Sequence, residues 1–113
     1  MLPRKFRLSI HDDIEGLIRK GARLYSPFFV IRYRPNTINK LRCAIIASAK
    51  IAPKAVHRNR LRRLLYKEIY TYIKIHPTPN VDLAILPTKK ALTALPIELI
   101  TTLKKSLSLL PKK

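Results

Sequence analysis

The chain has 113 residues and a formal net charge of +18, from 24 Lys and Arg against 6 Asp and Glu. Its length suits one modest core without a shift in composition, so we expect a single domain over residues 1–113. The basic residues are scattered from Arg4 to Lys113, which indicates a polyanionic partner. Hydrophobic residues make up 47% of the chain and fall into blocks, which excludes a disordered basic polypeptide.

The apolar runs are all shorter than the roughly 20 residues that a membrane span needs. The N-terminal sequence MLPRKFRLS also lacks the apolar centre of a signal peptide. We therefore expect a cytoplasmic protein with no membrane partner. The single cysteine, Cys43, lies in the apolar run CAIIASA, which is typical of a buried small hydrophobic residue rather than a reactive thiol.

The first predicted element is a helix over residues 10–20. Ser9 stands at its expected start, and Gly21 stands where a helix would stop. Its apolar residues recur at three-to-four spacing and are Ile10, Ile14, Leu17 and Ile18. Acidic residues in the first turn, Asp12 and Asp13, favour the positive end of the helix dipole.

Two strands are predicted next. The segment SPFFVIRYRPN, residues 26–36, is rich in aromatic and branched side chains and closes on the turn formers Pro35 and Asn36. The segment KLRCAIIAS, residues 40–48, is expected to pair with it in antiparallel fashion across a short loop.

A long helix is predicted over residues 55–74, because one face collects Leu61, Leu64, Leu65, Ile69 and Tyr72. The run VDLAILP, residues 81–87, predicts a buried strand, and LPIELITTLKKSLSLLP, residues 95–111, predicts a last helix that begins near Pro96. The long helix then serves as a crossover between strands two and three, and the other helices are expected to cover the same face of the sheet. The predicted fold class is α+β, a two-layer sandwich of order α-β-β-α-β-α.

The residue types that perform catalysis are not arranged for it. Five of the carboxylates are better explained by helix starts or by pairing with neighbouring bases, so no general acid and base stand out. His11, His57 and His76 lie far apart in the sequence, outside any metal-ligand spacing with Cys43. Two glycines make no phosphate-binding loop. We expect no catalytic residue, no bound metal or other cofactor and no small-molecule substrate.

The long helix instead predicts a basic face. A helical wheel places Asn59, Arg60, Arg63 and Lys67 opposite the apolar stripe. Arginine forks suit phosphate oxygens, and an asparagine amide suits a sugar hydroxyl or a base edge. A solvated helix face is the plain alternative, but charges of one sign at helical spacing repel one another without an anion, which favours nucleic acid. Tyr33, between Arg32 and Arg34, is the best candidate for stacking on a base.

The segment SAKIAPKAVHRNRLRRLLYKEIY, residues 48–70, resembles the protein subunit of bacterial ribonuclease P, whose Arg-Asn-Arg signature matches residues 58–60. The similarity extends to RLSIHDDIEGLIRKG, FFVI and VDLAILPTKKA. The resemblance implies an α/β sandwich with a left-handed β-α-β crossover. It also implies an RNA subunit that cleaves precursor tRNA to form the mature 5′ end with Mg²⁺ held by RNA, while the protein binds the catalytic RNA and the 5′ leader.

Carried over by position, the resemblance assigns two groups of residues. The contacts with the catalytic RNA would be Lys50, Lys54, Arg58, Asn59, Arg60, Arg62, Arg63 and Lys67. The cleft for the single-stranded leader would lie between the sheet and the long helix, with Ile14, Ile18, Arg32, Tyr33 and Ser48. The sequence departs from the family at Ile14 and Ile18, which replace phenylalanines, at Ala49, which replaces a lysine, and at Thr88, which replaces an arginine.

Three alternatives remain from the residues alone. A small ribosomal or other structural RNA-binding protein would share the charge, size and fold type. A nuclease active by itself would need metal-binding carboxylates or a histidine pair, and Asp82 is the acidic residue beside the third strand. A membrane-surface role would use the apolar face of the basic helix, which a core explains more simply.

Overall fold

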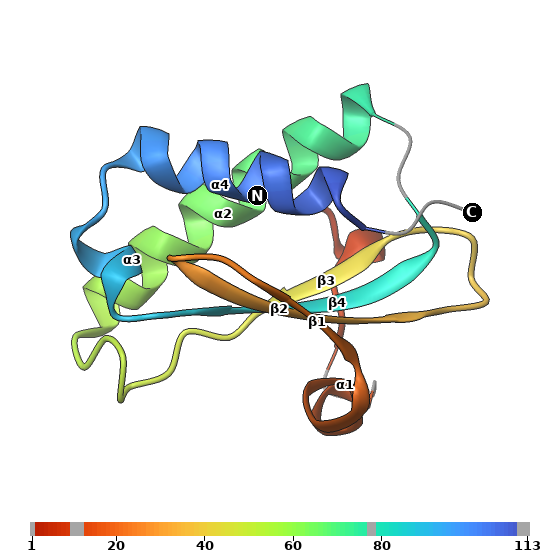
Figure 1. Cartoon of the computed structure of the whole chain (residues 1–113), viewed down its shortest axis with the longest axis horizontal. Helices are drawn as coiled ribbons and strands as arrows, with labels where there is room; N and C mark the ends of the chain where they lie inside the picture. Colours follow the sequence, from red (N-terminus) through yellow and green to blue (C-terminus); the bar gives the residue numbers. More distant parts are fainter. Residues whose placement is uncertain (1, 10–12, 77–78, 111–113) are drawn as a thin grey trace.

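A four-stranded sheet of order β1-β2-β4-β3 carries the fold (Figure 1). The computed structural model describes residues 2–9, 13–76 and 79–110. The strands are β1 (Ala22–Tyr25), β2 (Phe29–Pro35), β3 (Arg42–Ile45) and β4 (Val81–Pro87). The helical elements are the 3₁₀ turn η1 (Arg4–Phe6) and the α-helices α1 (Ile14–Lys20), α2 (Ala55–Ile75), α3 (Lys90–Thr93) and α4 (Pro96–Ser108). The predicted α+β class is confirmed.

The central strand β4 corrects the predicted pairing of the sheet. β2 pairs with β4 in antiparallel fashion and β3 pairs with β4 in parallel, so the expected hairpin between β2 and β3 is wrong. The two strands do run in opposite directions, but β4 lies between them. Six of the seven residues of β4 are buried. A strand is covered on both of its faces most fully at the centre of a sheet, which explains why β4 lies between β2 and β3. The sequence pattern also missed β1, whose residues are mostly exposed.

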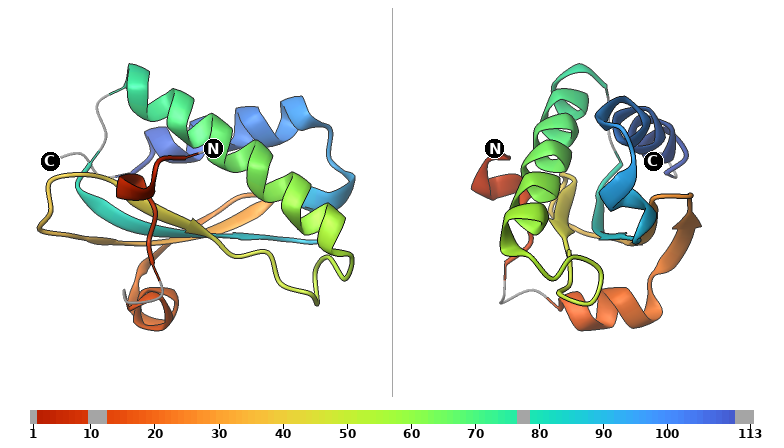
Figure 2. Two further views of the ribbon diagram at one scale, coloured as in Figure 1. Left: turned by 180° about the vertical axis from the view of Figure 1, so that it is seen from behind. Right: turned by 90° about the vertical axis from the view of Figure 1, so that its left-hand side faces the viewer.

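The helices lie on both faces of the sheet, not on one. α2 and α4 pack side by side on one face, while α1 lies on the other (Figures 1 and 2). The expectation that all helices share a face is therefore wrong. The physical reason is that the second face also needs cover: Leu17 of α1 is fully buried and α1 contacts both β2 and β4. The long helix α2 does connect the parallel strands β3 and β4, and the left hand of this crossover stays a prediction from the resemblance.

Acidic side chains accept backbone hydrogen bonds at the first turns of α1 and α4. α1 is capped by Asp13, whose Oδ1 accepts a hydrogen bond from the Gly16 amide at 2.9 Å, so it begins after the predicted cap at Ser9. Residues 10–12 of the predicted range lie outside the described residues. The Gly16 bond is the main reason that the pKa of Asp13 is lowered. α4 begins at Pro96 as predicted, and the Glu98 carboxylate accepts from the Leu95 amide at 2.8 Å.

The core lies between the sheet and the layer formed by α2 and α4. From α2 it takes four buried residues, which are Leu61, Leu65, Ile69 and Tyr72, and the sheet contributes buried Phe29, Ile31, Cys43, Leu83 and Ile85. The fifth predicted core position of α2, Leu64, is half-buried against the same cluster. Cys43 is buried as predicted, and burial raises the pKa of its thiol, which keeps it protonated at neutral pH.

A buried ion pair ties β3 to β4 on the face that carries α1. Arg42 Nε and Nη2 each lie 2.9 Å from a different oxygen of the Asp82 carboxylate. Asn36 Nδ2 donates to Asp82 Oδ1 at 2.9 Å, so the carboxylate is bonded from two directions. Only 5% of the Asp82 side chain is exposed, which makes it a structural group rather than a candidate for catalysis.

We predict that Asp82→Ala lowers the free energy of unfolding by about 3 kcal/mol, because it leaves the largely buried Arg42 guanidinium without its carboxylate. Urea denaturation at neutral pH measures the change. Glu15→Ala is the matched control, since the Glu15–Arg19 pair has side chains 81% and 68% exposed and should contribute less than about 1 kcal/mol. Equal losses in the two variants would contradict the structural role of Asp82.

Candidate nucleic-acid interface

The outward face of α2 carries the basic residues that the helical wheel predicts. Asn59, Arg60, Arg63 and Lys67 are exposed, and Arg58 and Arg62 are half-buried at its margins. The phase of the helix is set on its other side, where Leu61, Leu65 and Ile69 pack on the sheet. Lys54 is exposed at the N-cap of α2, and Lys50 is exposed in the segment that leads to it.

Arg58 differs from its neighbours because its guanidinium serves the fold. Arg58 Nη1 donates to the carbonyl oxygens of Ala52 at 2.7 Å and of Pro53 at 2.9 Å. These bonds hold the segment before α2 against the first turn of the helix, which has no side-chain cap. Arg58 therefore positions Lys50 and Lys54, which lie on that segment.

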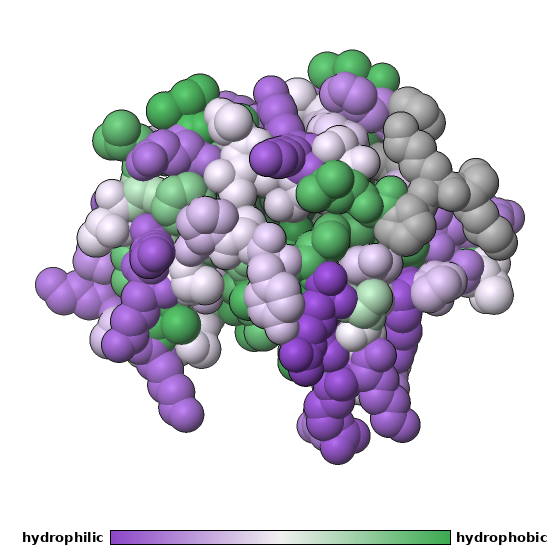
Figure 3. Space-filling model, viewed as in Figure 1, coloured by the Kyte–Doolittle hydropathy of each residue, from purple (hydrophilic) through white to green (hydrophobic). Residues whose placement is uncertain are grey.

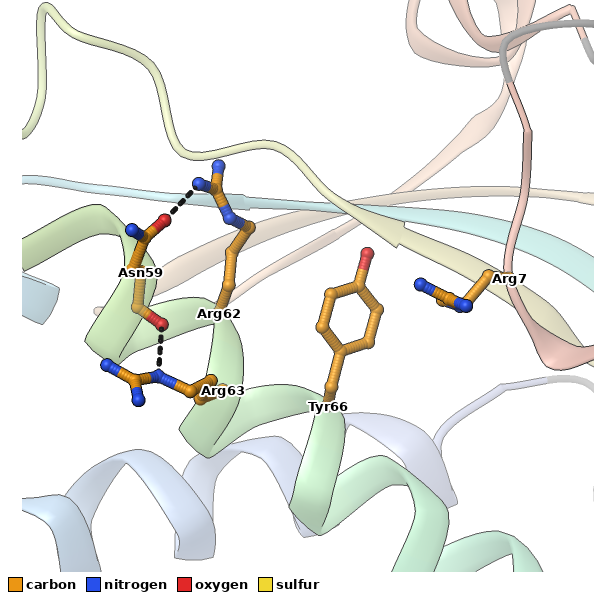
Figure 4. A pocket seen from close by; sticks show the side chains of 5 residues that line it. All are labelled: Arg7, Asn59, Arg62, Arg63 and Tyr66. Carbon is orange, nitrogen blue, oxygen red and sulfur yellow. Dashed lines mark hydrogen bonds between the residues drawn. The ribbon is translucent and has the colours of Figure 1, made fainter. Parts of the chain in front are cut away.

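Asn59 orients two arginines of the following turn (Figure 4). Its side-chain oxygen accepts from Arg62 Nη2 at 2.6 Å, and its backbone oxygen accepts from Arg63 Nε at 3.4 Å. In the described part of the chain, none of the α2 arginines forms an ion pair with a carboxylate. Arg62 and Arg63 are thus held in place by a neutral residue, Asn59, which does not offset their positive charge.

A hollow of about 500 Å³ opens beside these arginines and is lined by Arg7, Asn59, Arg62, Arg63 and Tyr66. Figure 4 shows the Tyr66 ring between Arg62 and Arg7, with Arg7 reaching in from the N-terminal segment. The Tyr66 hydroxyl accepts from the Ile45 amide at 3.1 Å, and burial raises the pKa of this phenol, so it stays neutral. Neither Arg7 nor Tyr66 was predicted from the sequence as a site residue. Tyr66 lies four residues after Arg62 on the same side of the helix, which was the available signal.

A second hollow, of about 420 Å³, lies on the other flank of α2, towards α3 and the start of α4. Apolar residues make up most of its lining, among them Leu61, Leu64, Leu92 and Leu99. His57 and Arg60 also line it. The basic residues of α2 thus point to two sides of the helix, with Arg60 on one side and Arg62 on the other.

The residues predicted for the leader cleft are divided between the two faces of the sheet and the segment after β3. The interior between the sheet and α2 is filled by core side chains, and the place where a leader binds stays a prediction. Arg32 faces α1, where its Nη2 donates to the carbonyl oxygens of Gly21 at 2.9 Å and Arg19 at 3.0 Å. Tyr33 packs against the core on the opposite face, because successive residues of a strand point to opposite sides.

The other three predicted cleft residues lie outside the core of the α2 layer. Ile14 and Ile18 are half-buried in α1, on the side of the sheet that Arg32 faces. Ser48 is exposed in the segment after β3, where its carbonyl oxygen accepts from the Ala52 amide at 3.0 Å. Hydrophilic side chains project on this side of the molecule, around α1 and over the segment that precedes α2 (Figure 3).

No three His, Cys, Asp or Glu side chains among residues 2–9, 13–76 and 79–110 lie close enough to hold a metal ion. Within the same ranges, no helix has the length and apolarity to cross a membrane. What the site presents is a set of oriented guanidinium groups with a neutral amide and a neutral phenol, which is suited to phosphate and sugar oxygens.

Comparison with known proteins places the chain in a family. Residues 2–110 match the family model described as ribonuclease P. A ribonuclease P protein component from Prochlorococcus marinus is 30% identical over 112 residues, which cover 86% of this chain and 88% of that protein. One from Synechococcus elongatus is 41% identical over 68 residues, which cover 57% of this chain and 56% of that protein. The chain therefore spans little more than half the length of some curated relatives that it matches.

Two solved structures share the fold. The ribonuclease P protein from Thermotoga maritima superposes with a TM-score of 0.82 at 23% identity, covering 93% of this chain and 97% of the other. That from Staphylococcus aureus gives 0.80 at 22% identity, covering 91% and 93%. At such identity these structures show the fold alone, and the match over residues 2–110 adds the family. The chain belongs to the ribonuclease P family.

Proposed function

We propose that the chain is the protein subunit of ribonuclease P, in which it binds the catalytic RNA and assists removal of the 5′ leader of precursor tRNA. The observation that carries the proposal is the outward face of α2, where the Arg-Asn-Arg motif of residues 58–60 continues into Arg62 and Arg63 without a carboxylate partner among the described residues. Such a face is complementary to an RNA backbone.

The two RNA partners would use different faces. The catalytic RNA would lie along α2, with Lys50, Lys54, Asn59, Arg60, Arg62, Arg63 and Lys67 as its contacts. The precursor tRNA leader would lie on the α1 side of the sheet, near Ile14, Ile18 and Arg32, with Ser48 on the segment that precedes α2. Tyr33 leaves this set, since it packs against the core. Thr88, which replaces the family's arginine, donates to the Pro27 carbonyl at 3.1 Å and so fastens a turn instead.

The chemistry would belong to the RNA. The Mg²⁺ that assists cleavage would be held by the RNA subunit, because the described residues of this chain supply no cluster of metal ligands. The protein would lower the repulsion between two RNA molecules and position the leader, so that its effect appears as tighter binding of substrate and Mg²⁺. We place this work in the cytoplasm, and the function requires neither a membrane nor a small-molecule substrate.

The first experiment measures cleavage of a 5′-extended precursor tRNA at low Mg²⁺ by the protein alone, by a bacterial ribonuclease P RNA alone, and by both. We predict efficient cleavage only with both components. Cleavage by the protein alone would mean an autonomous nuclease. Tight RNA binding without stimulated cleavage would favour a structural RNA-binding protein, such as a ribosomal one, which the shared charge and size leave as the second candidate.

The salt dependence of binding gives a second test. If the protein contacts about six phosphates, its affinity for the catalytic RNA falls by about three orders of magnitude between 50 and 200 mM salt. Filter binding or fluorescence anisotropy over this range measures the slope of the logarithm of affinity against that of salt. A slope near zero would contradict an interface built on phosphate contacts.

A pair of arginine variants separates binding from folding. Arg60→Ala should weaken binding to the catalytic RNA about tenfold and reduce the salt slope by about 1, while the free energy of unfolding changes by less than about 0.5 kcal/mol. Arg58→Ala should also lower the free energy of unfolding, by on the order of 1 kcal/mol, because two backbone carbonyls lose their donor. Urea denaturation and RNA binding are measured on both variants. Equal loss of stability in the two would refute the distinction.

A further inference from the structure

The hollow beside α2 gathers positive charge from two distant parts of the sequence. Arg62 and Arg63 reach it from α2, and Arg7 reaches it from the N-terminal segment. The five residues that line it include no Asp or Glu. Arg7 Nε is closed to bulk solvent, and no described residue accepts a hydrogen bond from it. Leaving such a donor without a partner is unfavourable, the more so in a charged group.

Arg7 is held in this position by its neighbours in the chain. Its backbone forms a parallel bridge with Cys43, and the Leu8 amide donates to the Cys43 carbonyl at 2.9 Å. On its other side the Phe6 ring lies 6.4 Å from the Tyr70 ring of α2. Figure 2 shows the N-terminal segment lying along α2. The segment is thus fixed to both the edge strand β3 and α2, which places Arg7 beside the arginines of α2 in advance of any ligand.

We propose that this hollow is a binding site for one phosphate of an RNA backbone, formed jointly by Arg7, Arg62 and Arg63. The inference rests on the proposed function for the source of the phosphate and deepens it by naming a contact outside the α2 motif. A phosphodiester in the hollow would accept hydrogen bonds from the guanidinium groups of Arg7, Arg62 and Arg63, and it would reduce the repulsion among them.

Neutral groups complete the site. The Tyr66 hydroxyl accepts from the Ile45 amide and keeps its own proton, so it can donate to a phosphate oxygen. Asn59 holds Arg62 through its side-chain oxygen, which fixes the direction of one arginine fork. The site is therefore oriented before binding, and the side-chain entropy lost on binding is reduced.

The test compares Arg7→Met with Arg4→Met. Methionine keeps an unbranched side chain and removes the charge, and Arg4 is an exposed arginine of the same segment. Affinity for a bacterial ribonuclease P RNA is measured between 50 and 200 mM salt. Arg7→Met should weaken binding about tenfold at 100 mM salt and reduce the slope by about 1, and Arg4→Met should weaken it by less than about threefold. Equal affinities for Arg7→Met and the unaltered protein would overturn the site.

A direct readout uses the arginine Nε–H signals of the ¹⁵N-labelled protein by NMR. Titration with inorganic phosphate, and separately with the catalytic RNA, should shift the Arg7 signal with saturation and the Arg4 signal only weakly. Equal shifts at Arg4 and Arg7 would overturn the site. If Arg7→Met fails to fold, Arg7→Lys supplies the measurement, since it keeps the charge, loses the fork and should bind RNA with intermediate affinity.

The two hypotheses fail in different ways. If the unaltered protein does not bind the catalytic RNA but phosphate still shifts Arg7 with saturation, the phosphate site stands and the proposed function falls. If the protein binds the RNA and stimulates cleavage while Arg7→Met behaves as the unaltered protein, the function stands and the site falls.

Discussion

The packing of one side of α2 against the sheet determines what the rest of the molecule presents to solvent. Leu61, Leu65 and Ile69 are buried there, and they set the rotation of the helix about its axis. With that rotation fixed, the intervening arginines have only the outer face and its two margins to occupy. The candidate site is therefore a consequence of core packing, and a change in the apolar stripe would also turn the basic residues away from their present directions.

Three of the six acidic residues serve the fold and lie away from the outward face of α2. Asp82 is bonded to Arg42 and Asn36 inside the sheet, Asp13 caps α1, and Glu98 caps α4. None of these bonds touches the outward face of α2. A protein of net charge +18 is destabilised by self-repulsion when it is alone, and a polyanion relieves that repulsion on binding. Charge that weakens the free chain thus becomes part of its affinity for RNA.

Periodic segments were predictable and long-range pairing was not. The bounds of α2 and β4 followed from their apolar patterns, since a helix stripe and a doubly buried strand leave clear signals. The position of β4 between β2 and β3 left no such signal in the sequence. Inward and outward residues alternate along β2 and β3 in the same way whichever strand they pair with. Likewise the sequence identified the arginines of α2 but missed Arg7, whose approach to Tyr66 depends on tertiary contacts across more than fifty residues. Tyr33 was considered for stacking on a base, but in β2 it packs against the core, while its neighbour Arg32 faces α1.

The position of β4 also bears on how the chain is made. The strands β2 and β3 are synthesised early but have no direct pairing with each other, and both depend on a strand that begins at Val81. The bond from Asn36 to Asp82 spans 46 residues of sequence. On the ribosome, the chain before Val81 can pair β1 with β2, but it lacks the strand that joins β2 to β3, so one edge of each of these two strands is unpaired until β4 is made. The pairing that joins β2 to β3 through β4 therefore forms only after β4 has been synthesised.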